Sequence, residues 1–502
     1  MAMRRTWLDR AIAWVSPARG FDRARRRAAL AVLERTYEGA SVGRRTEGWR
    51  IASTGANAEV APALSRLRDR SRDLVRNNAY AAKATQALVS NIVGTGIVPR
   101  ARAKSKRLAE AADRLWARFV AEADVEGLTD LYGLQALIVR TIVESGECLV
   151  RIRERYASDG LAVPVQVEVL EPDFLDTAKA GEMASGGFIL SGVEFDQIGR
   201  RVAYWLFPTH PGESSFRRGA LASQRVPARS VLHLFERQRP GQVRGVPWVS
   251  STVLKLRDLD EYDDAELVAK KIAACFAAFV TGDLDGEPIG KDVSESADGH
   301  RVESFEPGMV AYLAAGRDVK FATPQTAPGY ADYMRVQLHA VAAGMGLTYE
   351  LLTGDLSQVN YSSIRAGLLE FRRRIEALQW QMLVPGLCRP LWRRFVETAQ
   401  AAGSLAAGEV EAEWTAPRFE AVDPLKDVQA DLFAVRAGFM SLKEAIARAG
   451  YDPAGVLAEI AETNALLDQL GLVLDSDPRR ATRTGQAKDA SVTGEDAPSP
   501  AN

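Results

Sequence analysis

The hydrophobic pattern changes its period near residue 145, and this change constrains the fold more than any other feature of the sequence. Before it, apolar side chains recur every three or four residues, as on one face of a helix. After it, they alternate with charged side chains, as in half-buried strands. The pattern predicts an α+β chain whose helices precede a mostly antiparallel β region at 145–236. Helices are expected at 62–93, 106–126 and 131–143, and strands at 148–156, 163–171, 188–196, 201–207 and 230–235.

The second half of the chain is dominated by helical spacing. Pro385 is expected to break its longest helix, because proline removes a helical hydrogen bond, whereas Pro62 is expected in a first turn. Residues 475–502 lack apolar content and are predicted to be disordered. Helices are expected at 245–282, 329–343, 362–402, 424–437, 441–448 and 453–470, a polar loop at 346–363, and short strands at 309–313, 319–321 and 410–414.

Charge is balanced over the chain but not along it. The 64 basic and 65 acidic residues give a net charge of −1, which excludes a uniformly basic nucleic-acid binder and a uniformly acidic protein. Residues 1–50 nevertheless sum to +7, and residues 283–308 sum to −6. Most of the basic residues are arginines. Two explanations account equally well for the arginine excess. One is codon bias, and the other is a need for bidentate contacts to phosphates and carboxylates.

Cysteine and histidine are too few and too scattered for a zinc site. Cys148, Cys275 and Cys388 are far apart, no C-x-x-C occurs, and the four histidines are isolated, so we expect no disulfide framework and a reducing compartment. No uncharged apolar run reaches 18 residues, and the apolar stretch 11–15 is too short for a secretory signal. We therefore expect a soluble, intracellular protein at synthesis.

No catalytic constellation is found. G-x-S-x-G, G-x-x-x-x-G-K-[ST] and H-E-x-x-H are absent, and the GTGIV stretch at 94–98 is interpreted as a helix C-cap and turn. The acidic cluster at 283–306 matches no EF-hand. Two alternatives stay open at this point: a Mg²⁺-dependent nucleic-acid-processing enzyme that uses these carboxylates, and a membrane-surface scaffold that uses the basic residues 1–50.

Five stretches, in this order along residues 60–400, resemble the portal proteins of tailed bacteriophages, in the lambda-like group. None of them is a catalytic motif, and their joint order makes the resemblance specific. They are SRDLVRNNAYAAKATQALVSNIVGTGIVPRA (71–101), ESGECLVRIR (144–153), LEPDFLD (170–176), RGVPWVSSTVLKLRDLDEYDDAELVAKKIAACFAAFV (244–280) and MGLTYELLTGDLSQVNYSSIRAGLLEFRR (345–373).

The resemblance implies a structural DNA conduit that is not an enzyme and needs no cofactor. Such portals form a ring, typically of twelve subunits, at one capsid vertex, and double-stranded DNA passes through it non-specifically. The implied partners are the terminase large subunit, head-completion and tail adaptor proteins, and the major capsid and scaffolding proteins, with no membrane. The implied location is the virion, after assembly in the host cytoplasm.

The resemblance also implies a portal fold with a wing of helices and strands, a helical stem, a small α/β clip and a helical crown. The expected divisions are a basic arm (1–60), the wing (61–245), a stem helix (246–281), the clip (282–326), a second stem helix (327–345), a tunnel-loop region (346–363), a long wing helix with a strand (364–420), the crown (421–472) and a disordered tail (473–502).

Two sets of residues are candidates for function under this resemblance. The DNA-channel set comes from the tunnel loop and the start of the next helix, and consists of Asp355, Ser357, Gln358, Asn360, Tyr361 and Arg365. Arg365 is expected to bind DNA or a carboxylate of a neighbouring subunit. The second set is expected to face the terminase or adaptor, and consists of Asp283, Asp285, Glu287, Asp292 and Glu295.

Overall fold

The computed structural model divides the chain into two units, 1–55 and 56–502. It describes residues 53–213, 222–274, 278–281, 293–295, 301–303, 318–321, 329–357, 359–417, 419, 423–474, 477 and 479, together with 12, 14–17, 21 and 47–48 of the first unit. Ile12, Trp14 and Val15 of the first unit are helical. The prediction of a disordered tail also falls almost wholly outside them.

Four helices begin the second unit. They are α3 (Ala56–Asn77), α4 (Ala79–Ile92), α5 (Lys106–Glu122) and α6 (Leu131–Ser145). The prediction of one helix over 62–93 was wrong, because Asn78 adopts an extended conformation between α3 and α4. Its side chain accepts a hydrogen bond from the amide of Ala81 and so caps α4. Pro62 lies inside α3 rather than in its first turn.

The β region is antiparallel, as predicted. One sheet has the order β3-β2-β9, and a second has the order β4-β5-β6-β7-β8. The predicted strand 188–196 is a hairpin instead, because Ser191 and Gly192 turn the chain with positive φ. The strands are β2 (Glu147–Glu154), β3 (Val165–Leu170), β4 (Gly181–Glu182), β5 (Phe188–Leu190), β6 (Val193–Phe195), β7 (Arg201–Leu206), β8 (Gln224–Pro227) and β9 (Val231–Phe235).

A separate strand pair joins residues more than 300 positions apart. β1 (Val98–Ala103) pairs antiparallel with β14 (Val410–Thr415), which is the strand predicted at 410–414. An aromatic cluster of Trp116, Phe119 and Phe395 packs beside Trp392, with ring centroids 5.0–5.4 Å apart. This cluster and the strand pair bring α5 together with the second half of the chain.

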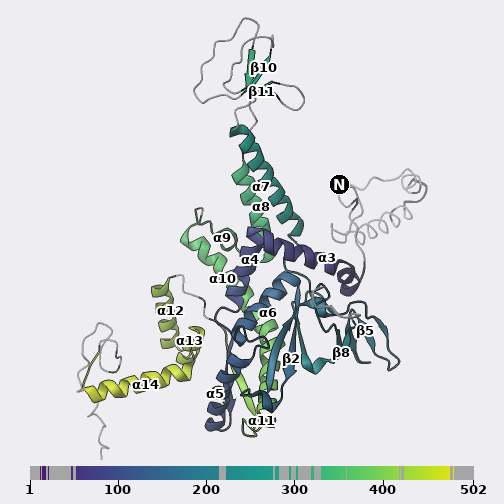
Figure 1. Cartoon of the computed structure of the whole chain (residues 1–502). Coiled ribbons are helices and arrows are strands. Elements are labelled where there is room, and N and C mark those ends of the chain that lie inside the picture. The colour runs from purple at the N-terminus through teal and green to yellow at the C-terminus, as the bar shows by residue number, and fades with distance from the viewer. Residues whose placement is uncertain are drawn as a thin grey trace, which may run out of the picture. The chain divides into compact units, whose positions relative to one another are not determined.

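The long helix predicted at 245–282 is shorter at both ends. It is α7 (Val253–Ala274), and β10 (Ala278–Thr281) follows it and pairs with β13 (Asp318–Phe321). α7 lies beside α8 (Tyr330–Met345) (Figure 1). Lys255 of α7 donates to Gln337 of α8 at 2.8 Å. β11 (Val293–Glu295) pairs with β12 (Arg301–Glu303), whereas the predicted strand 309–313 lies outside the described residues.

The expected loop 346–363 contains a short helix, α9 (Tyr349–Thr353), before α10 (Tyr361–Leu378). Pro385 does not break the long helix predicted at 362–402. Residues Gln379–Cys388 instead form a wider π-helical stretch that leads into α11 (Arg389–Ala401). A π-helical turn lets a helix continue past a residue that lacks an N–H. Gln379 at its start donates to the carbonyl of Ile92 at 2.8 Å, which joins this helix to α4.

Three helices end the described chain, close to their predicted positions. They are α12 (Pro424–Arg436), α13 (Leu442–Arg448) and α14 (Pro453–Leu470). Each starts at a side-chain cap, provided by Asp423, Ser441 and Asp452 respectively. Among the helices that the structure describes, none has the length and hydropathy needed to cross a membrane.

Candidate functional site

The motifs at 144–153 and 244–280 meet at a buried carboxylate. Glu147, the first residue of β2, is fully buried. Nε and Nη2 of Arg244 donate to its Oε1 at 2.8 and 2.5 Å, and the amide of Gly245 donates to Oε2 at 2.8 Å. Nε2 of His233, on β9, lies 2.9 Å from the same Oε2. The carboxylate therefore ties two sheet strands to the segment that leads into α7.

The protonation state of this cluster follows from its donors. Burial by itself would raise the pKa of Glu147, but the Arg244 charge and the hydrogen bonds from His233 and Arg244 hold it far below its ordinary value. Burial lowers the pKa of His233 to about 4. Arg201 can only donate, so the imidazole accepts at Nδ1, 2.8 Å away, and carries its proton on Nε2 toward Glu147. The ring is therefore neutral at pH 7.

Two glycines allow the same segments to approach each other. Gly146 ends α6 with a φ of 90°, and a Cβ there would overlap the backbone of Val246 and Pro247. A Cβ on Gly245 would overlap the carbonyl oxygen of Gly146. Only glycine fits such a backbone-to-backbone contact. Both positions belong to the stretches that carry the family resemblance, so part of that resemblance is a packing requirement.

A second ionic cluster extends the first toward α3. Arg72 donates to Asp173 at 2.5 Å, and Nη2 of Arg68 lies 3.4 Å from the same carboxylate. Nη1 of Arg68 also lies 3.9 Å from Glu147. The Ser71 hydroxyl donates to the carbonyl of Glu144 at 2.5 Å. The motifs that begin at residues 71, 144, 170 and 244 therefore converge on one connected network of charges.

The same region places Glu171, Asp173 and His210 with their ligand atoms within 4.8 Å of one another. Their chemistry does not fit a metal ion. The amide of Gly212 donates to Nδ1 of His210 at 3.0 Å, so the neutral ring carries its proton on Nε2, the atom that faces the carboxylates. Arg72 already pairs with both carboxylates. This group is an ion-pair cluster.

The predicted tunnel loop is held by its own hydrogen bonds. Hydrogen bonds from Ser357 lower the pKa of the half-buried Asp355, whose Oδ1 accepts from the Ser357 amide at 2.9 Å. Tyr349 of α9 donates to the other oxygen of Asp355 at 3.3 Å. Oδ1 of Asn360 accepts from the amide of Ser363 at 2.9 Å and caps α10. These polar groups thus stabilise the turn that precedes α10.

Gln358 lies outside the described residues, as does the side chain of Tyr361. Arg365, in the second turn of α10, donates to Asp427 of α12 at 2.8 Å. Its carboxylate partner in this structure therefore comes from its own chain. Arg365 lines a hollow of about 670 Å³ between α10 and the helices α12 and α13.

Among the predicted clip acids, only Glu295 is described. It ends β11, opposite Arg301 of β12 in the antiparallel register. Asp283, Asp285, Glu287 and Asp292 lie outside the described residues.

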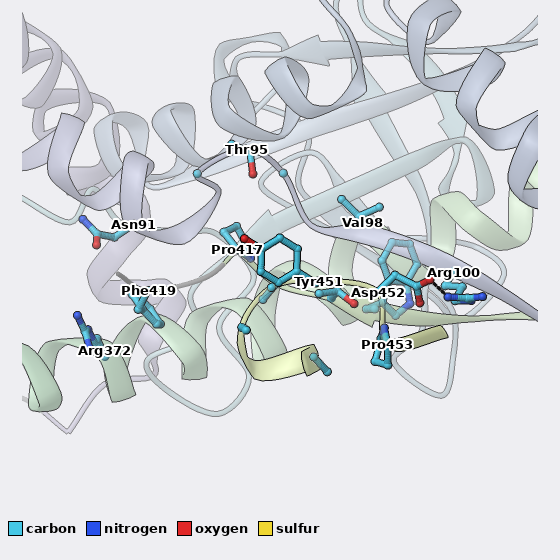
Figure 2. A pocket seen from close by; sticks show the side chains of 18 of the residues that line it. Asn91, Thr95, Val98, Arg100, Arg372, Pro417, Phe419, Tyr451, Asp452 and Pro453 are labelled. Atoms are coloured by element: carbon cyan, nitrogen blue, oxygen red, sulfur yellow. Dashed lines mark ion pairs between the residues drawn. The ribbon is translucent and has the colours of Figure 1, made fainter. Parts of the chain in front are cut away.

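A larger cleft, of about 980 Å³, was not predicted from the sequence. The turn after α4, the end of β14 and the turn between α13 and α14 line it, with Thr95, Pro417 and Tyr451 facing one another across it (Figure 2). An ion pair between Arg100 and Asp452 closes one side. The stretch 94–98 forms the predicted turn after a helix, with positive φ at both glycines. Its walls come from segments remote in sequence, so no local pattern indicates the cleft.

Comparison with known proteins agrees with this assembly of motifs. The family described as phage portal protein, lambda family, matches residues 42–379. The chain belongs to this family. Its members are structural proteins, so the chain is a structural protein and not an enzyme.

Relatives of known name share most of the chain. A probable portal protein of Halomonas phage phiHAP-1 is 27% identical, with 88% of each chain covered. Portal protein B of Escherichia phage lambda is 24% identical, with 84% of this chain and 87% of the relative covered.

Solved structures give weaker likenesses. The neck of a native gene transfer agent particle has a TM-score of 0.44 and 13% identity over 76% of this chain and 94% of that chain. An HK97-family phage portal protein from Corynebacterium diphtheriae has a TM-score of 0.30 and 10% identity, covering 71% and 95%.

Proposed function

We propose that this chain is the subunit of a homo-oligomeric ring, of twelve copies, at one vertex of a phage capsid. Double-stranded DNA is packaged through the ring and is ejected through it. The terminase large subunit docks on the ring during packaging, and head-completion or tail adaptor proteins take its place afterwards. The observation that carries this proposal is membership of the lambda portal family over residues 42–379.

The charge distribution supports a conduit. The chain as a whole is nearly neutral, although its segments differ in sign. Tight phosphate binding would stall moving DNA, because each neutralised phosphate contributes to affinity. Contacts to phosphates also carry no sequence information. A conduit must therefore bind phosphates only weakly and must accept any DNA sequence. A pore that combines neutral hydrogen-bonding groups with balanced charges does both.

The segment from Asp355 to Arg365 is our candidate for the DNA-facing part. Asp355, Ser357 and Asn360 lie at the exposed turn between α9 and α10. Asp355 accepts a hydrogen bond from Ser357, and Asn360 accepts one from Ser363. These bonds give the turn a defined form, which suits a loop that lines a channel. Gln358 and Tyr361 belong to the same stretch by sequence. Arg365 adds one positive charge that Asp427 partly neutralises.

The acidic residues Asp283, Asp285, Glu287, Asp292 and Glu295 are our candidates for the surface that meets the terminase or the adaptor. Repeated around a ring, they would form an electronegative rim that repels DNA and attracts basic partner surfaces. Major capsid and scaffolding proteins would contact the ring at its vertex during assembly in the host cytoplasm.

The decisive experiment is to purify the full-length chain without nucleotide. Light scattering coupled to size-exclusion chromatography should give close to twelve times the 54.7 kDa mass of the chain. Electron-microscopy class averages down the particle axis should show cyclic symmetry around an open pore. A stable monomer at micromolar concentration over a range of salt concentrations would overturn the proposal.

A further inference from the structure

The three C-terminal helices leave an extensive apolar surface uncovered. No residue within α12, α13 or α14, all of which are described, is buried. Large apolar side chains are nevertheless frequent there, and Phe439 between α12 and α13 is 88% exposed. Soluble proteins that act alone rarely expose contiguous apolar patches of this kind. The exposed members are Leu425, Val428, Leu432, Phe433, Phe439, Leu442, Ile460, Leu466 and Leu470.

On α12 the exposed apolar residues form one stripe that ends in a base. Leu425, Val428 and Leu432 recur at helical spacing, and Arg436 continues the same face. Asp427 lies on another side of the helix, where it pairs with Arg365 of α10. That pair holds one side of α12 against its own chain. Val428, at the edge of the stripe, lines the hollow beside the pair, whereas Leu425 and Leu432 do not.

On α14 a second stripe has the same spacing and the opposite charge. Val456 and Leu457 are half-buried on the side that packs against α13. Another side carries Glu459, Glu462, Leu466 and Leu470 at successive helical positions, all of them exposed. α14 itself contains no basic residue. A helix that is apolar on two sides is normally covered on both.

The two stripes match when their helices run antiparallel. Each stripe covers twelve residues, so its first and last residues are about 16 Å apart along the helix. Antiparallel packing sets the two glutamates of α14 beside Arg436 at one end. It also sets Leu466 and Leu470 beside Val428 and Leu425 at the other end. Within the described residues, Arg436, Glu459 and Glu462 form no ion pair, so one chain leaves these complementary charges unmatched.

We propose that α14 of one copy packs antiparallel on the α12 stripe of a second copy. Every chain offers one stripe of each kind, so the contact is heterologous and repeats from subunit to subunit around a closed ring. Apolar contact supplies the area, and the charges set direction and register. This inference rests on the proposed ring and names the surface that joins its C-terminal helices.

Disulfide trapping tests the contact directly. The full-length Val428→Cys/Leu466→Cys variant, oxidised as a purified ring, should give a ladder of linked subunits on a non-reducing gel. The matched control is Leu128→Cys/Leu466→Cys, since Leu128 is 82% exposed but lies between α5 and α6, away from both stripes. The control and the wild-type chain should remain monomeric on the gel.

Charge exchange gives an independent measurement. Glu459→Arg with Glu462→Arg should lower the denaturant concentration at which the ring dissociates, because each would face Arg436 of the neighbour. Adding Arg436→Glu to the same chain should recover most of that shift. The control is Arg102→Glu, on the distant strand β1. Added to the Glu459→Arg/Glu462→Arg chain, it should not recover the denaturant concentration at which the ring dissociates.

The outcomes separate this inference from the proposed function. If wild-type rings form, but the cysteine pair gives no ladder or the charge exchange gives no rescue, the α12–α14 contact is wrong and the ring stands. If the wild-type chain forms no ring, the proposed function itself fails.

Discussion

Glu147 and Arg244, 97 residues apart in sequence, form an ion pair that is almost wholly removed from water. The pair joins the first residue of β2 to the segment that enters α7. A buried charge that loses its partner is costly, because neither water nor another group replaces it. The stability of the whole β region therefore depends on this contact.

Glu147→Gln should lower the free energy of unfolding by about 3–5 kcal/mol, as expected when one partner of a buried ion pair is removed. The matched control is Glu413→Gln, which breaks the exposed pair with Arg102 and should cost less than about 1 kcal/mol. Denaturant titration followed by circular dichroism measures both. Equal effects of the two substitutions would contradict a structural role for the buried pair.

The stability should also fall as the pH is lowered from 6.5 to 4. Burial lowers the pKa of His233 from 6.5 to about 4, so in this window the unfolded chain binds a proton that the folded chain refuses. The free energy of unfolding therefore decreases with falling pH, with a limiting slope of about 1.4 kcal/mol per pH unit. Glu147 adds a further loss below its ordinary pKa of 4.5, because its folded pKa is lower.

His233→Gln isolates the histidine contribution. Glutamine can donate to Glu147 and accept from Arg201 without titrating, so the slope between pH 6.5 and 4 should flatten by close to one proton. Unfolding midpoints measured across this pH range check it. An unchanged slope would show that a group other than His233 takes up the proton on unfolding.

Gly146→Ala should prevent soluble assembly, because its Cβ would overlap the backbone at Val246 and Pro247. Gly199→Ala is the matched control, since it has a comparable φ of 79° but nothing within 4 Å of the added Cβ. It should cost only the backbone strain of about 1–2 kcal/mol. Soluble yield and melting temperature of the two variants distinguish the effect of the backbone overlap at residue 146 from the effect of backbone strain alone. Similar losses in both variants would refute the packing argument.

Asn360→Ala should weaken the first turn of α10 by about 0.5–2 kcal/mol, because its side chain caps that helix. Hydrogen exchange at 361–366 should become faster. Asn360→Asp keeps an acceptor and should restore protection. If Asn360→Asp restores the helix but still reduces DNA packaging, the residue acts on DNA; if packaging recovers with the helix, its role is structural.

Arg365→Ala and Asp427→Asn both break the ion pair between α10 and α12. If Arg365 also faces DNA, only its own substitution should alter the length of packaged DNA in infected or induced cells. Identical behaviour of the two variants would assign Arg365 to the ion pair alone.

The helices α5, α6 and α12–α14 and the strands β2 and β7 could be predicted because short-range periodicity sets them. Asn78 shows where this fails. Its flanking sequence is helical on both sides, and the break is stabilised by a hydrogen bond to Asp260, 182 residues away. Strand β1 likewise depends on a partner at 410–415. The tunnel-loop residues stay a prediction that rests on the family resemblance. The cleft between the turn after α4 and Tyr451 has no local signal in the sequence.

The sequence by itself determined most of the helices and strands, the near-neutral charge and, through five ordered motifs, the portal family. Those properties depend on residue type and local spacing. Only the tertiary structure decided what the motifs do. Arg68, Glu147, Asp173 and Arg244 are ordinary charged residues in the sequence, and their connection becomes visible when distant segments pack. Burial makes each charge depend on its partner, and burial is a property of the folded chain alone.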